Sequence, residues 1–176
     1  CRRYAAQPPP ARDCHILCRV VCRGQLLTQQ ITVSPTMPNK SLYLIDAYAL
    51  IFKYYYAFMG RPMRNREGLN TSVVFGFTKF LRDILKREKP DLIGVAFDPP
   101  GGSFRREIYP EYKANRPPTP EDIKLSVPYV KRLLEAMCIP ILEVEGFEAD
   151  DVIGTLAKRG AQAGYRVYMV TPDKDY

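Results

Sequence analysis

Three short apolar runs along the chain each lead into aspartate residues. Leu42–Ile45 ("LYLI") ends at Asp46, Leu92–Phe97 ("LIGVAF") ends at Asp98, and Arg166–Val170 ("RVYMV") runs into the acidic stretch "TPDKDY". Short β-branched and aromatic runs that alternate with longer amphipathic segments are typical of buried strands in a parallel sheet. The pattern therefore predicts three parallel strands.

The segments between these runs predict helices. Apolar residues recur at helical spacing in residues 72–88 and 126–138, and again in residues 148–163, where Gly164 stands at the expected left-handed C-cap. A further strand-like run, residues 140–145 ("PILEVE"), precedes the last of these helices. The predicted fold class is α/β, with a parallel sheet flanked by helices.

The first 36 residues have a different composition. Five arginines against one aspartate give them +4 of the chain's total net charge of +7, and four of the five cysteines lie before residue 23. Cys14, Cys18 and Cys22 have a C-x3-C-x3-C spacing that matches none of the common zinc sites. We expect residues 1–36 to be a disordered or artefactual extension and residues 37–176 to form the domain.

Acidic side chains collect at one edge of the predicted sheet. Functional groups of an open parallel sheet gather beyond the carboxyl ends of its strands, and the predicted helix at residues 148–163 begins on the same side. Each acid alone has a simpler explanation, as a turn residue or as a partner of the helix dipole. Together they predict a site for Mg²⁺ or Mn²⁺, because hard ions prefer oxygen ligands and residues 37–176 contain no histidine. The seven carboxylates are those of Asp46, Asp98, Glu148, Asp150, Asp151, Asp173 and Asp175.

A basic and aromatic segment follows Asp98. The stretch "SFRREIYPEYKANRPPTPED" places arginines and lysines for phosphates among aromatic faces for bases, as single-stranded nucleic acid binding requires. A solvated, proline-rich loop is the alternative for this stretch taken alone. A second group follows Asp46, where Lys53 stands beside three tyrosines and is placed to reach a phosphate. The candidate substrate-binding residues of the first segment are Arg105, Arg106, Tyr109, Tyr112, Lys113 and Arg116.

Four motifs resemble one known family. "LIDAYALIFKYYYAF", "FDPPGGSFRREIYPEYKANRPPTPED", "GFEADDVIGTLA" and "TPDKDY" are similar, in this order, to the N-terminal 5′-nuclease domain of bacterial DNA polymerase I, in the flap endonuclease (PIN-like) superfamily. The resemblance implies a helical arch over the site and two divalent ions that serve cleavage at DNA 5′ ends or flaps. It assigns the seven carboxylates to the metal site, where Asp150 and Asp175 can bind through water. It also places Lys113 and Arg116 near the scissile phosphate.

Two departures from the family pattern bear on function. Lys53 stands where the family commonly has arginine, so a bidentate phosphate contact becomes a point charge. The family continues after "TPDKD" with a Gly-Asp-x-x-Asp-Asn motif and a helix–hairpin–helix element, so we expect this chain to be a truncated domain. A DNA-binding fragment that does not cleave and a PIN-type ribonuclease are the alternative functions. We further expect a monomer in the reducing bacterial cytoplasm. We expect no membrane partner, because no apolar run reaches 18 residues.

Overall fold

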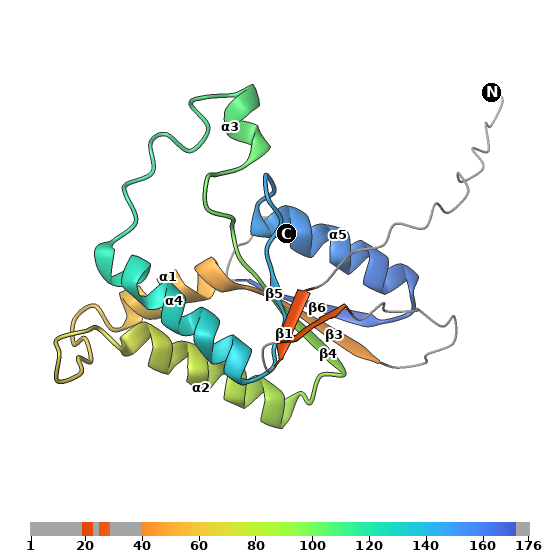
Figure 1. Ribbon diagram of the computed structural model, residues 1–176, viewed down its shortest axis with the longest axis horizontal. Coiled ribbons are helices and arrows are strands. Elements are labelled where there is room, and N and C mark those ends of the chain that lie inside the picture. Colours follow the sequence, from red (N-terminus) through yellow and green to blue (C-terminus); the bar gives the residue numbers. More distant parts are fainter. Residues whose placement is uncertain (1–18, 23–24, 29–39, 172–176) are drawn as a thin grey trace.

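A four-stranded parallel sheet forms the centre of the domain (Figure 1). The computed structural model describes residues 19–22, 25–28 and 40–171. Every pair of neighbouring strands is parallel, and the order across the sheet is β5-β4-β3-β6, which confirms the predicted architecture. The strands are β3 (Ser41–Asp46), β4 (Leu92–Ala96), β5 (Ile141–Leu142) and β6 (Arg166–Val170).

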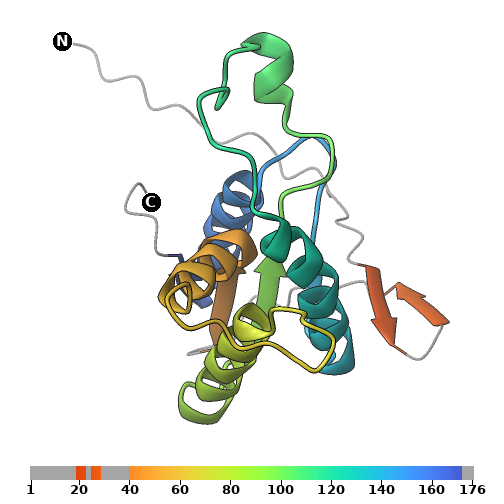
Figure 2. The same ribbon diagram turned by 90° about the vertical axis from the view of Figure 1, so that its left-hand side faces the viewer.

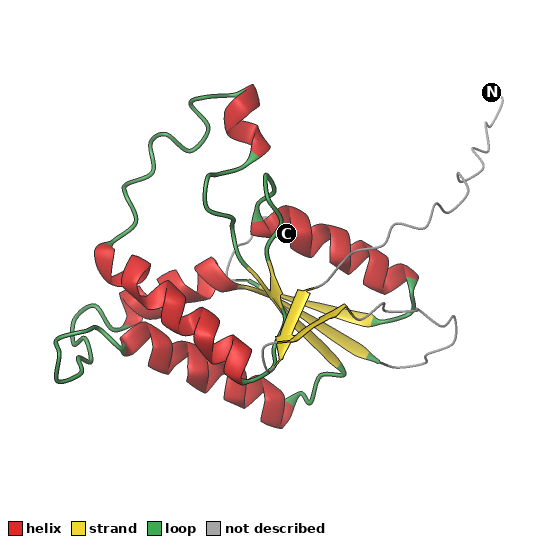
Figure 3. Cartoon of the chain, viewed as in Figure 1, coloured by secondary structure: helices red, strands yellow, loops and turns green. Residues whose placement is uncertain are grey.

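Helices cover both faces of this sheet, as Figure 3 shows. Side chains alternate between the faces, so Ile45 and Val95 pack against α1, α2 and α4, whereas Leu44 and Ala96 pack with Ile153 of α5. α4 begins before the predicted start at residue 126, because the acidic pair Glu121 and Asp122 suits a first helical turn. The helices are α1 (Ala47–Ala57), α2 (Ser72–Arg87), α3 (Phe104–Ile108), α4 (Glu121–Ala136) and α5 (Ala149–Gln162).

A long connection, residues 99–120, joins β4 to α4, and we call it the arch. In Figures 1 and 2 it rises from the carboxyl edge of the sheet, carries α3 at its far end and returns to the start of α4. The family resemblance implied a basic helical arch at this place. Its regular α-helical part is the five-residue α3.

Two strands outside the main sheet were not predicted. β1 (Arg19–Cys22) and β2 (Gln25–Thr28) pair antiparallel in a sheet of their own, within the segment for which we predicted disorder. Both are short apolar runs, and pairing satisfies their backbone hydrogen bonds locally. The boundary between an extension and a domain at residues 36 and 37 stays a prediction. In the part of the chain that is described, no helix has the length and apolar character needed to cross a membrane.

Gly76 gives a test of how closely α1 and α2 pack. A Cβ atom at Gly76 would lie 2.4 Å from Cδ1 and 3.0 Å from Cβ of Tyr54, so the clash involves the root of the ring. We expect Gly76→Ala to lower the free energy of unfolding by about 1–3 kcal/mol through overpacking. Gly154→Ala in α5 is the control, since no atom lies within 4 Å of its added Cβ, and it should stabilise by roughly 0.5–1 kcal/mol. Urea unfolding measures the free energy of unfolding of both variants. Equal changes in the two variants would contradict the close contact of α1 and α2 at Gly76.

Candidate active site

Asp46 lies where β3 becomes α1. It is the N-cap residue of α1, and its Oδ1 accepts a hydrogen bond from the Ala49 backbone N–H at 3.0 Å. The residue is 8% exposed. Burial and the negative charges of Asp150 and Asp98 together raise the pKa of Asp46 to about 6, against the lowering effect of the Ala49 hydrogen bond. The structure therefore brings the carboxylates of Asp98 and Asp150 close enough to Asp46 to repel it.

Asp98 connects the end of β4 to the start of α5. Its Oδ1 accepts a hydrogen bond from the Ala149 backbone N–H at 2.7 Å. The first N–H groups of a helix have no partner within the helix, so a carboxylate there satisfies one of them and complements the helix dipole. This contact fixes the beginning of α5 at the carboxyl edge of the sheet.

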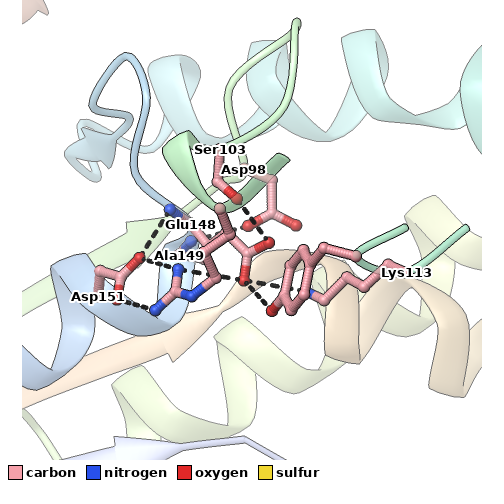
Figure 4. Close-up of polar contacts among 8 residues, drawn as sticks. Asp98, Ser103, Lys113, Glu148, Ala149 and Asp151 are labelled. Carbon is pink, nitrogen blue, oxygen red and sulfur yellow. Dashed lines mark hydrogen bonds and ion pairs between the residues drawn. The ribbon is translucent and has the colours of Figure 1, made fainter. Parts of the chain in front are cut away.

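Glu148, the N-cap residue of α5, receives most of its contacts from the arch (Figure 4). Its Oε1 accepts a hydrogen bond from the Ser103 hydroxyl at 3.1 Å. Its Oε2 accepts from the Tyr112 hydroxyl at 3.2 Å and from Lys113 Nζ at 2.9 Å, and lies 3.6 Å from Arg105 Nη1. Burial acts to raise the pKa of Glu148, but the hydrogen bond and charge of Lys113, with the two hydroxyls, outweigh it and lower that pKa.

Asp151 pairs with Arg105 in a two-pronged contact. Nη1 and Nη2 of Arg105 donate to Oδ2 and Oδ1 of Asp151, both at 2.6 Å. This bidentate pair lowers the pKa of Asp151 and raises that of Arg105. Asp151 Oδ2 also accepts the Glu148 backbone N–H at 3.1 Å, which is one half of a capping box at the start of α5. The guanidinium lies 5.0 Å from the centre of the Phe104 ring.

The other basic and aromatic residues of the arch are more exposed. Tyr109 donates its hydroxyl hydrogen bond to Glu111 at 2.9 Å, and Arg106 lies against Gly102. Arg116 is exposed, and its charge acts on Lys113. Lys113 itself has a left-handed backbone, with φ of 59°.

The predicted site residues thus fall into groups. The first comprises Asp46, Asp98 and Asp150, and the second comprises Glu148 and Asp151, whose positive partners in the structure are arch side chains. Sequence reasoning expected a metal ion to balance all of them and arch cations to bind the substrate, and it did not predict the pairing of Arg105 and Lys113 with these acids. Lys53 is exposed on α1, about two helical turns beyond Asp46. Asp173 and Asp175 lie outside the described residues.

Sequence reasoning also missed Ser103. This side chain is buried at the foot of the arch and contacts Glu148 across 45 residues of sequence. The available signal was a serine directly before "FRREI", at a position where a helix N-cap is expected. That signal predicts a local cap and not a contact with a distant glutamate.

The donor chemistry at this edge fits a hard divalent ion, although the ligands are not preassembled. Within residues 40–171, no three acidic, histidine or cysteine side chains form a ready ligand cluster. Asp46 and the two carboxylates near it, those of Asp98 and Asp150, nevertheless present oxygen donors, and a bound cation relieves the repulsion that Asp46 experiences. Asp46, Asp98, Asp150 and, after it leaves Lys113, Glu148 could hold such an ion.

Comparisons with known proteins agree with this geometry. The family model described as "5′-3′ exonuclease, N-terminal resolvase-like domain" matches residues 41–176. The chain is 37% identical to a 5′-3′ exonuclease of Aquifex aeolicus over 136 residues, which cover 77% of this chain and 46% of that protein. It is 40% identical to DNA polymerase I of Mycobacterium tuberculosis over 150 residues, or 85% of this chain and 17% of the polymerase. The chain thus spans less than half the length of either relative.

Solved structures share the fold. The zinc-bound T5 5′-exonuclease aligns with a TM-score of 0.58 at 23% identity, covering 77% of this chain and 50% of that one. The bacteriophage T5 D15 flap endonuclease, solved as a pseudo-enzyme-product complex with DNA and metal ions, aligns with a TM-score of 0.54 at 22% identity, with the same coverage. At these identities the similarity shows a common fold. Taken with the family match over residues 41–176, it means that the chain belongs to the family of the N-terminal, resolvase-like domain of 5′-3′ exonucleases.

Proposed function

We propose that this chain is the catalytic part of a 5′-3′ exonuclease or flap endonuclease within a bacterial DNA polymerase I. It would hydrolyse phosphodiester bonds at DNA 5′ ends or flaps with divalent ions, for replication and repair. The observation that carries the proposal is the buried Asp46 beside Asp98 and Asp150, directly under an arch whose cations reach the same edge of the sheet. Family membership and the metal-bound and DNA-bound neighbours support it.

The chain's own residues divide the work. Asp46, Asp98, Asp150 and Glu148 would hold the divalent ions, which we propose to be two Mg²⁺ or Mn²⁺, with Asp151, Asp173 and Asp175 completing the set. Bound ions of this kind activate a water molecule and neutralise charge on the phosphate and the leaving oxygen. Lys113, which now donates to Glu148, would bind a phosphate oxygen with its flexible ammonium group.

The exposed arch residues are the proposed DNA contacts. Arg106, Tyr109 and Arg116 combine positive charge with an aromatic face and leave their side chains open to a strand that passes the arch. Lys53 would contact a phosphate from α1. The Tyr112 hydroxyl donates to Glu148, and Lys113 Nζ lies 5.1 Å from the centre of the Tyr112 ring. Tyr112 would contact DNA after Lys113 moves to a phosphate.

The setting is proposed from the same relatives. The named polymerases are bacterial, so we propose action in the bacterial cytoplasm on nucleoid DNA. We propose that the chain acts as a monomer.

A labelled 5′-flap duplex tests the function. We expect the chain to release a short labelled 5′ fragment in Mg²⁺ or Mn²⁺ and none in EDTA, with Asp98→Asn inactive as the matched variant. Gel retardation in Ca²⁺ measures binding separately. Retention of the flap without shortening would identify a binding module that does not cleave. Faster cleavage of a matched RNA flap would identify a ribonuclease, because only RNA offers a 2′-OH at the cut site.

A further inference from the structure

Ser103 lies where the arch leaves the sheet. Its position in the sequence predicts that its hydroxyl caps helix α3, but the hydroxyl does not do so. It is the N-cap residue of α3, with an extended backbone at φ of −110° and ψ of 160°. Serine at this position ordinarily accepts a hydrogen bond from the first N–H groups of its helix. The Ser103 side chain makes no such bond and instead donates to Oε1 of Glu148 at 3.1 Å. A local preference given up in this way points to a use elsewhere.

The backbone around Ser103 holds this hydroxyl in place. Ser103 forms an isolated parallel bridge with Gly146, and the Phe104 N–H donates to the Gly146 carbonyl at 2.8 Å. The rings of Phe104 and Phe147 lie 5.5 Å apart beside this bridge. Ser103 is 7% exposed, so little water competes for its hydrogen bond. The foot of the arch is therefore clamped to the loop that leads into Glu148.

The two oxygens of Glu148 have partners of different kinds. Oε1 accepts a hydrogen bond from the neutral hydroxyl of Ser103. Oε2 accepts from Tyr112 and from the charged Lys113, which both lie on the returning limb of the arch, residues 109–120. A divalent ion competes at Oε2 with the charged partners Lys113 and Arg105, whose Nη1 lies 3.6 Å from this oxygen. A neutral donor at Oε1 carries no charge that a cation would repel, so it can stay in place during that exchange.

We propose that Ser103 is a positioning residue for Glu148: its hydroxyl fixes the orientation of the carboxylate, so that Oε2 is presented to a divalent ion. This inference rests on the proposed function. Without the hydroxyl, the Glu148 carboxylate loses its donor at Oε1 and can change its orientation. Partners of this kind behind a metal ligand typically contribute 10–100-fold to metal affinity.

Calorimetric titration with Mn²⁺ tests this role without reference to cleavage. We expect Ser103→Ala to lower the Mn²⁺ affinity by at least about tenfold. Ser103→Thr keeps a hydroxyl and is expected to restore most of that affinity, and Ser103→Cys, a weak donor of similar size, is expected to fall between them. Ser126→Ala is the matched control, because Ser126 is 1% exposed and donates to the Asp122 carbonyl at 2.6 Å, within α4. It should lose stability and keep its Mn²⁺ affinity.

Three results would overturn the inference alone. These are an unchanged affinity in Ser103→Ala, an equal loss in Ser103→Ala and Ser126→Ala, and a Ser103→Thr variant as weak as alanine. Thermal unfolding of each variant shows that the proteins compared are folded. Absence of Mn²⁺ binding by the unaltered chain would overturn the proposed function together with this inference, so the two failures can be told apart.

Discussion

Asp46→Asn is expected to stabilise the metal-free chain at neutral pH by about 3 kcal/mol. The folded-state pKa of about 6 lies above the ordinary value of 3.8, and each pKa unit corresponds to roughly 1.36 kcal/mol. Between these two values the unfolded chain has released a proton that the folded chain still holds, so stability falls as the pH rises through this window. Above about pH 6 the folded chain carries the full free-energy cost of the charged Asp46 carboxylate. Asparagine removes the charge and can still cap α1.

The measurement is urea unfolding in EDTA at a series of pH values from 4 to 7.5. The difference between the unaltered chain and Asp46→Asn should be small near pH 4 and grow as the pH rises. Glu148 and Asp151 act with the opposite sign, because their pKa values are lowered, but both are present in each protein and cancel in the difference. Glu121→Gln, at a carboxylate 72% exposed, is the control and should show no such trend. A pH-independent difference for Asp46→Asn would contradict the burial of this carboxylate.

The same variant reports on metal binding. A ligand that binds the folded chain alone stabilises it by RT ln(1 + L/Kd), where L is the free ligand concentration, so the effect grows with the ratio of free ligand to Kd. Mg²⁺ should therefore stabilise the unaltered chain and have a much smaller effect on Asp46→Asn. If Mg²⁺ stabilised the two proteins equally, the ion would bind at a site that does not include Asp46.

Lys113→Gln is expected to slow flap cleavage by about 10²–10³-fold at saturating Mg²⁺. A preorganised cation beside the reacting phosphate contributes this much when it acts on charge that develops in the transition state. Glutamine keeps most of the side-chain length and can still hydrogen-bond, so the change is chiefly the loss of charge. Single-turnover rates, measured with enzyme in excess over the flap, separate this step from substrate binding and product release.

Lys124→Gln is the matched control for Lys113→Gln. Lys124 is exposed on α4 and pairs with Glu121 three residues away, which is the ordinary environment of a surface lysine. Its replacement should leave the cleavage rate unchanged. If both variants lose activity to the same degree, the effect reflects general attraction of DNA and not a position near the reacting phosphate.

The sheet was predictable because its signals are local. The apolar runs that end at Asp46 and Asp98 coincide with β3 and β4, and residues 166–170 were placed without error. Helix α1 was not assigned, because its tyrosines were interpreted for their chemistry and its helical character depends on packing against α2 and α4. Boundaries were less certain where prolines lie, as at the start of α4.

The partners of the acids were not predictable to the same degree. The sequence shows that Glu148 and Asp151 need a positive partner, but Arg105 and Lys113 are separated from them by more than 30 residues. Their meeting depends on how far the arch bends back, which no periodic pattern encodes. The sequence therefore predicted which acids and cations lie at this edge of the sheet. It did not predict which cation pairs with which acid.

The left-handed backbone of Lys113 carries a conformational cost at the point where the arch meets Glu148. A non-glycine residue in this conformation costs roughly 1–2 kcal/mol, which its hydrogen bond to Glu148 helps to offset. The residue that brings a cation to the acidic edge is therefore also the one that carries the backbone strain of the arch.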